Sequence, residues 1–329
     1  MYNTPILFIT FNRPLHTLNV WDKIIAQKPA KLFIFQDGAR LDNNQDAERC
    51  LSVQKIVSQP LTWNCARHFW FAETNMGCGS GPAAAISWFF SLVEQGVIIE
   101  DDAVPADDFF VYAEELLIRY QDNENVRAIG SMKIDPHTYG DGSYYFSMMN
   151  RTLCAWATWR RAWNDFDYRL QGITKKELYK ALDYYHATLR EKEYWYERLL
   201  EIQKDRLKDT SWDQQFWISI WLKKGMGIVP NHNLSSNIGF DAEATHTTNQ
   251  QSIAAKRATE SILPLVHPSG FEIQRKADLQ FHKLYFTPFE YGISGLKRLH
   301  YRINKRIKRM VNHTGPWIKK INASIHLFI

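Results

Sequence analysis

In the first hundred residues, short apolar runs alternate with helical patterns, and this alternation limits the fold more than any other feature of the chain. Residues 5–11, 31–35, 68–72 and 97–99 are rich in β-favouring side chains, and helix-like stretches fill the intervals between them. Strands separated by helices favour parallel βαβ units with helices on both faces of the sheet. We therefore predict an α/β fold with a mixed, mainly parallel sheet flanked by helices.

Polar residues stand where the predicted strands end. Asn12 and Arg13 follow the first strand, Asp37 lies in an Asp-Gly turn after the second, and acidic residues 100–102 follow the fourth. In open parallel sheets, ligands bind beyond the carboxyl ends of the strands. This edge of the sheet is therefore the predicted ligand site.

The acidic triplet Glu100, Asp101 and Asp102 directly follows the apolar run 97–99. Adjacent carboxylates at the end of a buried strand are costly unless a cation compensates them. Mg²⁺ and Mn²⁺ prefer oxygen ligands and bridge carboxylates to phosphate oxygens. The triplet therefore indicates a Mn²⁺ or Mg²⁺ site that also holds a diphosphate. The alternative is a solvated turn or a helix cap.

Three other residues near this edge have both a binding and a structural interpretation. Arg13 could form an ion pair with a diphosphate, or it is an ordinary surface arginine. Asp37 could accept hydrogen bonds from a ribose or a base, or it serves only its turn. The glycine-rich segment that begins at Gly77 would let backbone N–H groups approach a ligand. Its spacing matches neither the Walker A nor the GxGxxG pattern, so it is a weak phosphate motif.

Farther along the chain, Asp213 follows Trp212 at a predicted helix start. A carboxylate there is a candidate general base, because a hydroxyl group is a poor nucleophile until its proton is taken. A helix N-terminus also favours an acidic residue for structural reasons alone. His232 and His246 lie in the polar stretch 229–248, where a lid over a bound ligand is expected. His246 is a second candidate metal ligand, and the alternative for both histidines is an ordinary surface position.

The composition narrows the class of protein. The chain has 329 residues, 45% of them hydrophobic, which suits one large α/β domain or two smaller ones. Its 12 Trp, 15 Tyr and 19 Phe fit a thick aromatic core or a site that stacks sugars. Four cysteines form no CxxC pair, so we expect reduced thiols in a cytoplasmic protein. The N-terminus lacks the basic start of a signal peptide, and no apolar run approaches the length of a membrane span.

The C-terminal tail is strongly basic. Residues 291–329 contain nine Lys or Arg and no acidic residue, and apolar residues repeat there at spacings of three or four. This pattern predicts a basic amphipathic helix. The helix would either lie on an anionic membrane surface or pack its apolar side on the main domain. Nucleic acid is a less favoured partner.

The order of these motifs resembles that of GT-A-fold glycosyltransferases, most closely the N-acetylglucosaminyltransferase I family. The similarity covers roughly residues 5–245. The matching segments are, in chain order, strand 5–11 with Asn12-Arg13, the Phe-Gln-Asp-Gly turn 35–38, residues 97–102 with the Asp-Asp-Phe-Phe segment 107–110, the segment 153–159, Ser211-Trp212-Asp213, and strand 228–230.

The resemblance implies a domain plan. A GT-A-like (Rossmann-like) domain would span residues 1–250, with a nucleotide-sugar half at about 1–125 and an acceptor half at about 126–250. A helical C-terminal extension, 251–329, would follow and include the basic amphipathic helix.

The resemblance also implies roles for single residues. Asp102 would be the direct metal ligand, Asp213 the general base, and Trp156 and Trp212 acceptor-side residues. The residues implied on the nucleotide-sugar side are Thr10, Asn12, Arg13, Asp37, Gly77, Glu100 and Asp101. The chain departs from the family pattern at two positions: Gln214 stands where a second Asp is expected, and Ala155 where a Gly precedes the tryptophan.

Together the residues and the resemblance predict a metal-dependent, inverting glycosyltransferase. The resemblance implies UDP-N-acetylglucosamine, or a similar UDP-sugar, as the donor, and the acceptor would be a glycan or a lipid-linked molecule. The enzyme would act in the cytoplasm or at the inner face of the cell membrane. One alternative is a sugar-phosphate nucleotidyltransferase, which predicts a glycine-rich loop with a basic residue directly after the first strand. The chain has Phe-Asn-Arg-Pro at 11–14 instead. The other alternative is a non-catalytic sugar-binding protein of the same fold.

Overall fold

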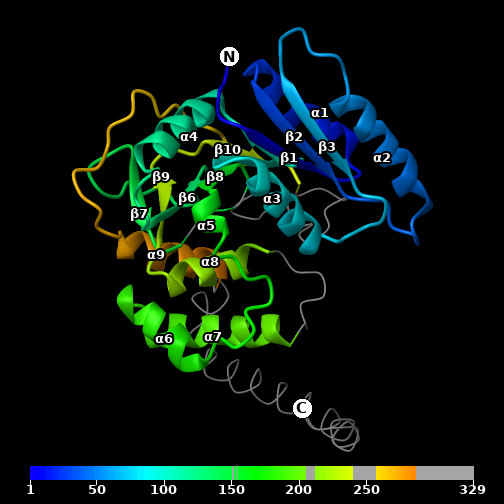
Figure 1. Ribbon diagram of the computed structural model, residues 1–329. Coiled ribbons are helices and arrows are strands. Elements are labelled where there is room, and N and C mark those ends of the chain that lie inside the picture. The colour runs from blue at the N-terminus through cyan, green and yellow to red at the C-terminus, as the bar shows by residue number, and fades with distance from the viewer. Residues whose placement is uncertain (150–151, 153, 205–211, 240–256, 287–329) are drawn as a thin grey trace, which may run out of the picture. The chain divides into compact units, whose positions relative to one another are not determined.

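The computed structural model describes residues 1–149, 152, 154–204, 212–239 and 257–286 (Figure 1). The chain divides into two compact units, Met1–Phe281 and His282–Ile329. In the second unit the described part is the π-helix η1, His282–Phe286. The predicted basic helix of the tail, like His246, lies outside the described residues.

The first unit is built on one large mixed sheet, and a two-stranded sheet accompanies it within the described residues. The strand order of the large sheet is β3-β2-β1-β4-β8-β6-β9-β7, and all strands but β7 and β8 run in one direction. Its strands are β1 Ile6–Thr10, β2 Lys31–Gln36, β3 Ala66–Phe71, β4 Gln95–Glu100, β6 Val126–Gly130, β7 Tyr144–Ser147, β8 Trp156–Trp159 and β9 Met226–Pro230. The predicted α/β class with a mixed, mainly parallel sheet is confirmed.

Helices cover both faces of this sheet, as predicted (Figure 1). Phe8 in β1 stacks on Trp21 of α1, with ring centroids 6.2 Å apart. Its neighbours Leu7 and Ile9 point to the opposite face and join a core cluster that contains α3 residues. The helices are α1 Pro14–Ala26, α2 Asn44–Val57, α3 Ser80–Leu92, α4 Asp107–Arg119, α5 Arg160–Trp163, α6 Lys175–Tyr184, α7 Leu189–Gln203, α8 Asp213–Leu222 and α9 Arg275–Phe281.

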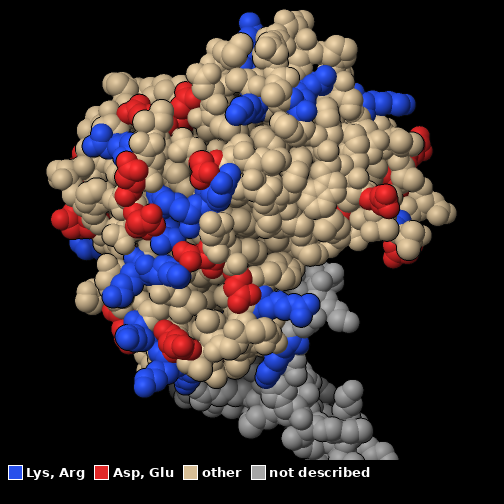
Figure 2. All heavy atoms as spheres, viewed as in Figure 1, with Lys and Arg blue, Asp and Glu red and all other residues tan. Residues whose placement is uncertain are grey.

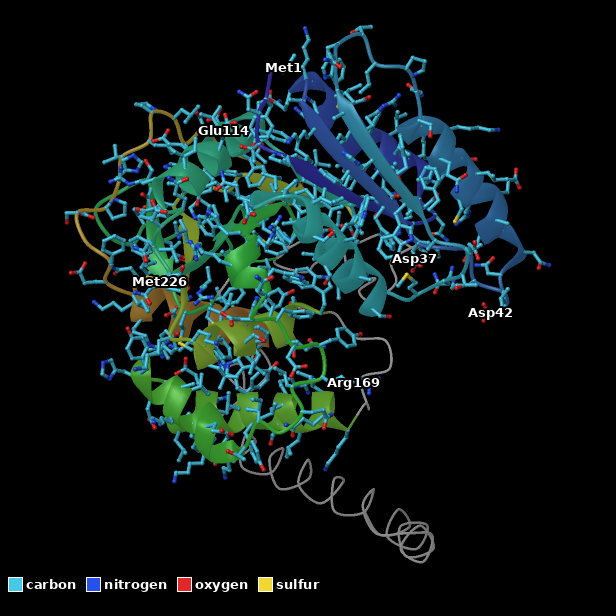
Figure 3. All side chains as sticks on the ribbon, viewed as in Figure 1. Met1, Asp37, Asp42, Glu114, Arg169 and Met226 are labelled. Atoms are coloured by element: carbon cyan, nitrogen blue, oxygen red, sulfur yellow. The ribbon has the colours of Figure 1, made fainter. Side chains whose placement is uncertain are left out.

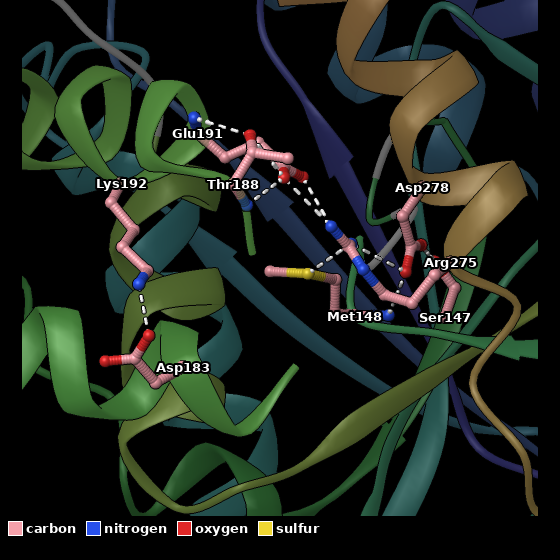
Figure 4. A network of polar contacts seen from close by, with 8 residues as sticks. All are labelled: Ser147, Met148, Asp183, Thr188, Glu191, Lys192, Arg275 and Asp278. Atoms are coloured by element: carbon pink, nitrogen blue, oxygen red, sulfur yellow. Dashed lines mark hydrogen bonds and ion pairs between the residues drawn. The ribbon is translucent and has the colours of Figure 1, made fainter. Parts of the chain in front are cut away.

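A buried polar network fastens α9 to the rest of the unit (Figure 4). Arg275 donates to both carboxylate oxygens of Glu191 in α7, at 2.9 Å each, and pairs with Asp278 at 3.2 Å. Asp278 in turn accepts a hydrogen bond from Ser147 at the end of β7. Glu191 and Asp278 are 1% and 0% exposed, so loss of Arg275 would deprive two buried carboxylates of their shared cation. This network therefore sets α7 against β7.

In the described part of the chain, no helix is both long and apolar enough to span a bilayer. All four cysteines are free thiols in the structure.

Candidate functional site

The register of two parallel strands brings the predicted site together. β1 and β4 pair side by side, with Ile9 opposite Glu100, so both strands end at the same edge of the sheet. The residues that follow them, 11–13 and 101–102, are therefore neighbours although about ninety residues separate them in sequence. The backbone N–H of Phe11 donates to Asp101 Oδ2 at 3.1 Å, and Arg13 Nη1 donates to Asp102 Oδ2 at 3.3 Å. The prediction that these two segments meet is confirmed.

The triplet is strongly acidic and poorly solvated. Burial, the charges of Asp102 and Asp101 and, to a smaller extent, that of Asp213 raise the pKa of Glu100 to about 8. Burial and the charge of Asp102 raise the pKa of Asp101 to about 6, against the opposing effect of Arg13. Burial also raises the pKa of Asp102, although Arg13 lowers it. Arg13 alone therefore does not neutralise the site, and a second cation would relieve the repulsion.

The oxygen atoms of the triplet fit a divalent cation that takes most of its coordination from a bound phosphate compound and water. Asp102 Oδ1 is buried and has no hydrogen-bond partner among the described residues, while Arg13 occupies Oδ2. That leaves one carboxylate oxygen for a metal, and Mg²⁺ and Mn²⁺ commonly take one or two carboxylates together with phosphates and water. Within the described residues no group of three or more His, Cys, Asp or Glu side chains is arranged around a common point.

Asp213 lies near the triplet, at the first position of α8. Its charge is one of those that raise the pKa of Glu100, and the residue is only 9% exposed. A helix N-terminus stabilises a carboxylate at this position. Next to it, Gln214 Oε1 is buried without a hydrogen-bond partner in the described part of the chain. The site therefore holds a fourth acidic residue from a separate element.

Trp156 and Trp212 do not offer a surface to a sugar. Their rings stack on each other at 5.3 Å and 25°, and they are 0% and 2% exposed, in the same core cluster as Phe216. The prediction that they contact an acceptor conflicts with this burial, because both ring faces meet protein. Trp212 is the residue that precedes α8, so its packing fixes the start of that helix and with it Asp213.

Asp37 anchors the glycine-rich turn. Its Oδ1 accepts hydrogen bonds from the backbone N–H groups of Gly38 and Met76, and its Oδ2 accepts from Gly77 N and Asn75 Nδ2, all between 2.7 and 3.1 Å. Figure 3 shows Asp37 close to α3, where this turn enters the helix. Gly77 has φ of +84°, a conformation that favours glycine. Contact of Asp37 or Gly77 with a nucleotide stays a prediction, and in this structure Asp37 binds the turn.

Thr10 and Asn12 also bind protein groups. Thr10 Oγ1 donates to the carbonyl of Phe35 at 3.0 Å, and Asn12 Nδ2 donates to Asp46 Oδ1 at 2.7 Å. Asp46 is fully buried and forms an ion pair of 2.6 Å with Arg40. No sequence pattern pointed to this pair, since Asp46 resembles an ordinary first-turn acid of α2. Together these contacts hold the β1–α1 connection rigid.

A cysteine beside the triplet was also not expected from the sequence. Cys154 is buried, and its backbone has φ of +66°. Burial, and the charges of Asp102 and Glu100, raise the pKa of its thiol far above the usual range. A raised pKa keeps this thiol protonated, so it adds no charge to the site.

A cavity of about 360 Å³ lies away from this site, and Ser87, Phe90, Arg160 and Trp163 are among its lining residues. Arg160 directly follows β8, and the last residue of β8 pairs with Gln95 at the start of β4. The cavity therefore lies at the end of the sheet where β4 begins, opposite the end that carries the triplet. α3 has no charged residue, and the surface over it is uncharged in Figure 2. Nothing in the cavity matches the acidic chemistry of the triplet.

No protein-family profile matches the sequence, and no curated protein matches it. Several solved structures overlap with part of the chain. HddC from Yersinia pseudotuberculosis is 9% identical, over 53% of this chain and 85% of its own, with a TM-score of 0.30. A UDP-glucose pyrophosphorylase complexed with UDP-glucose is 11% identical, over 49% and 78%, with a TM-score of 0.29. The 4-diphosphocytidyl-2C-methyl-D-erythritol synthase from Anaerococcus prevotii is 7% identical, over 57% and 79%, also at 0.29. At these scores the likeness assigns no reaction to this chain.

Proposed function

We propose that this protein is a nucleotide-sugar-dependent transferase and, more closely defined, a metal-dependent inverting glycosyltransferase. The observation that carries the proposal is the meeting of three groups at the carboxyl edge of the sheet. These are the buried Oδ1 of Asp102, which has no hydrogen-bond partner among the described residues, the guanidinium of Arg13 and the separate carboxyl group of Asp213. Such a set can hold a diphosphate at one end and deprotonate a hydroxyl at the other.

The donor side rests on Asp102 and Arg13. Asp102 would hold Mn²⁺ or Mg²⁺ through Oδ1, and the cation when bound neutralises the negative charge that develops on a leaving diphosphate. Arg13, whose guanidinium is close to Asp102, would bind the phosphate oxygens. Asp101 accepts from the backbone of Phe11, which holds the two segments of the site together.

The acceptor side rests on Asp213. This carboxylate would take the proton of the acceptor hydroxyl. The hydroxyl oxygen then forms the new bond to the anomeric carbon, and the bond from that carbon to the diphosphate breaks. Glu100 suits this role less well, because in the metal-free site burial and the charges of Asp102 and Asp101 raise its pKa to about 8. Attack by one hydroxyl from the face opposite the leaving group inverts the anomeric configuration.

The donor and acceptor are proposed from the resemblance to the N-acetylglucosaminyltransferase I family. UDP-N-acetylglucosamine is the first donor to test, and the acceptor would be a glycan or a lipid-linked sugar. A cytoplasmic enzyme that reaches the inner face of the cell membrane through its basic tail would meet such an acceptor.

Sugar-phosphate nucleotidyl transfer is the second candidate. UDP-glucose pyrophosphorylase, one of the structures that overlap with this chain, is named for such a reaction. Against it stands the β1–α1 connection. It contains no glycine, Pro14 begins α1, and Asn12 and Arg13 are engaged by Asp46 and Asp102. A glycine-rich loop that wraps a triphosphate has no counterpart there.

A product assay with two arms separates the candidates. The first arm combines a panel of nucleotide-sugars with Mn²⁺ and acceptor sugars, and measures release of nucleoside diphosphate. The second combines nucleoside triphosphates with sugar 1-phosphates, and measures pyrophosphate. Glycosyl transfer predicts product in the first arm alone, and its loss in Asp213→Asn. Pyrophosphate in the second arm would establish the nucleotidyltransferase instead, and nucleotide-sugar binding without product in either arm would indicate a binding protein.

A further inference from the structure

We propose that Gly239 is a positioning residue that fixes the orientation of the Asp102 carboxylate. We also propose that His16 holds the backbone next to Gly239 in place. The inference rests on the proposed diphosphate and metal site and adds two residues to it. It concerns the short segment 237–239, which we call the clasp.

The clasp is held directly beside the triplet by backbone pairing. β10, Ser235–Asn237, runs antiparallel to β5, Ala103–Pro105, with Asn237 opposite Ala103. β5 starts at the residue after Asp102, and the pairing extends one step farther, because Ile238 N donates to the carbonyl of Asp102 at 2.9 Å. The clasp is therefore fixed to the backbone of the acidic residue itself.

Two side chains hold the clasp in its path. Asn237 Oδ1 accepts a hydrogen bond of 2.8 Å from Gly239 N, which bends the chain after β10. From α1, His16 Nε2 lies 3.2 Å from the carbonyl oxygen of Ile238. His16 is one helical turn after Arg13, so one end of α1 supplies both the residue that contacts Asp102 and the residue that contacts the clasp.

The Asp102 side chain fills the space into which a side chain at position 239 would point. A Cβ atom there would collide with Asp102 Oδ2 and would lie 2.9 Å from Asp102 Cγ, well inside contact distance. By contrast, Gly77 has an unusual φ but open space where a Cβ atom would lie. The backbone of Gly239 thus packs closely against one oxygen of Asp102.

Gly239 and Arg13 both restrain the same oxygen, Oδ2 of Asp102. Arg13 contacts Oδ2, and Gly239 closes the space beside Oδ2, while Oδ1 is left without a hydrogen-bond partner among the described residues. The carboxylate therefore has one oxygen held by Arg13 and one buried oxygen without a hydrogen-bond partner among the described residues. A fixed oxygen of this kind suits a cation that it shares with a diphosphate, since residues that orient a metal ligand affect affinity nearly as much as the ligand does.

The test compares UDP binding by Gly239→Ala and the wild type, by calorimetry, with Mn²⁺ and with chelator. We expect Gly239→Ala to bind UDP about 10- to 100-fold more weakly in Mn²⁺, as for other residues that orient a metal ligand. The weaker binding in chelator should be unchanged, because it does not use Asp102 Oδ1. Wild-type affinity in Mn²⁺, or an equal loss under both conditions, would overturn the inference.

A second measurement covers the case in which Gly239→Ala folds poorly. His16→Phe removes the hydrogen bond to Ile238 without adding a clash at 239, and it should show the same Mn²⁺-specific loss, with His16→Gln retaining more of the affinity. Thermal unfolding of Gly239→Ala in the wild-type and Asp102→Ala backgrounds tests the clash itself. The alanine should lower Tm much less when the carboxylate is gone, and an equal decrease would refute the steric contact.

These outcomes separate the inference from the proposed function. Failure of the wild type to bind UDP or any other nucleoside diphosphate with Mn²⁺ would contradict the proposed function. Tight binding by the wild type together with undiminished binding by Gly239→Ala and His16→Phe would contradict only the positioning role.

Discussion

Replacing Glu100 with glutamine is expected to stabilise the metal-free protein, and to do so more strongly as the pH rises. The pKa of Glu100 is about 8 in the folded protein, compared with 4.5 for an unperturbed glutamate. Because the folded state holds the proton more tightly, the wild type loses stability as the pH rises from about 4.5 through about 8. Glutamine has the same shape and no proton to lose, so it removes this part of the pH dependence.

The size of the effect follows from the pKa difference. A pKa raised from 4.5 to about 8 corresponds to at most ~5 kcal/mol, at 1.36 kcal/mol for each pKa unit. Since solvent and neighbouring side chains relax around a carboxylate at the edge of a sheet, we expect a gain of about 1–3 kcal/mol in the free energy of unfolding at pH 8.5. At pH 5 the folded wild type keeps its proton while the unfolded state has begun to lose it, so the gain should be smaller, at most about 1 kcal/mol.

The assay is urea unfolding of the wild type and Glu100→Gln at pH 5 and pH 8.5, with chelator present. Glu73→Gln is the matched control, because Glu73 is exposed. The control should shift stability equally at both pH values. If the difference between Glu100→Gln and the wild type does not grow with pH, Glu100 is not the buried, repelled acid described above.

Three other changes test separate parts of the site. Asp213→Asn should lower glycosyl transfer by about 10²- to 10⁴-fold while UDP affinity in Mn²⁺ stays within about twofold, as expected for loss of a general base. The control is Asp122→Asn, at an exposed position. Equal turnover by the two variants would reject Asp213 as the base. Trp156→Ala should cost about 3–5 kcal/mol of stability, measured by urea unfolding, because the ring lies in the core; a stable variant with a raised acceptor KM would instead favour the acceptor contact. Deletion of residues 294–329 should reduce co-sedimentation with anionic liposomes, and unchanged sedimentation would favour a tail that packs on the protein.

The sheet was largely predictable, because β1, β2 and β4 contain continuous apolar runs that are buried in the fold. The runs at 31–35 and 97–99 lie within β2 and β4. The place of β8 was not predictable, since it inserts antiparallel between β4 and β6 through pairings such as Ile98 with Trp156. Such pairing depends on contacts between residues far apart in sequence, which a local pattern does not contain.

The site was predictable where it depends on strand ends and less so where it depends on packing. Arg13 and Asp102 meet because β1 and β4 are parallel neighbours, a consequence of the fold class itself. Trp156 was wrongly assigned to the ligand surface, because an aromatic residue in a motif does not reveal whether its ring is covered. Gly239 lies 137 residues from Asp102, and only the folded chain shows that the two share one space.

The proposed function depends above all on joint binding of a metal and a diphosphate by Asp102 and its neighbours. Calorimetric titration of UDP into the wild type and Asp102→Ala, each with and without Mn²⁺, measures this joint binding. We predict that Mn²⁺ strengthens UDP binding by the wild type and has no effect on Asp102→Ala. Equal, Mn²⁺-dependent affinity in both proteins would contradict the assignment of the site.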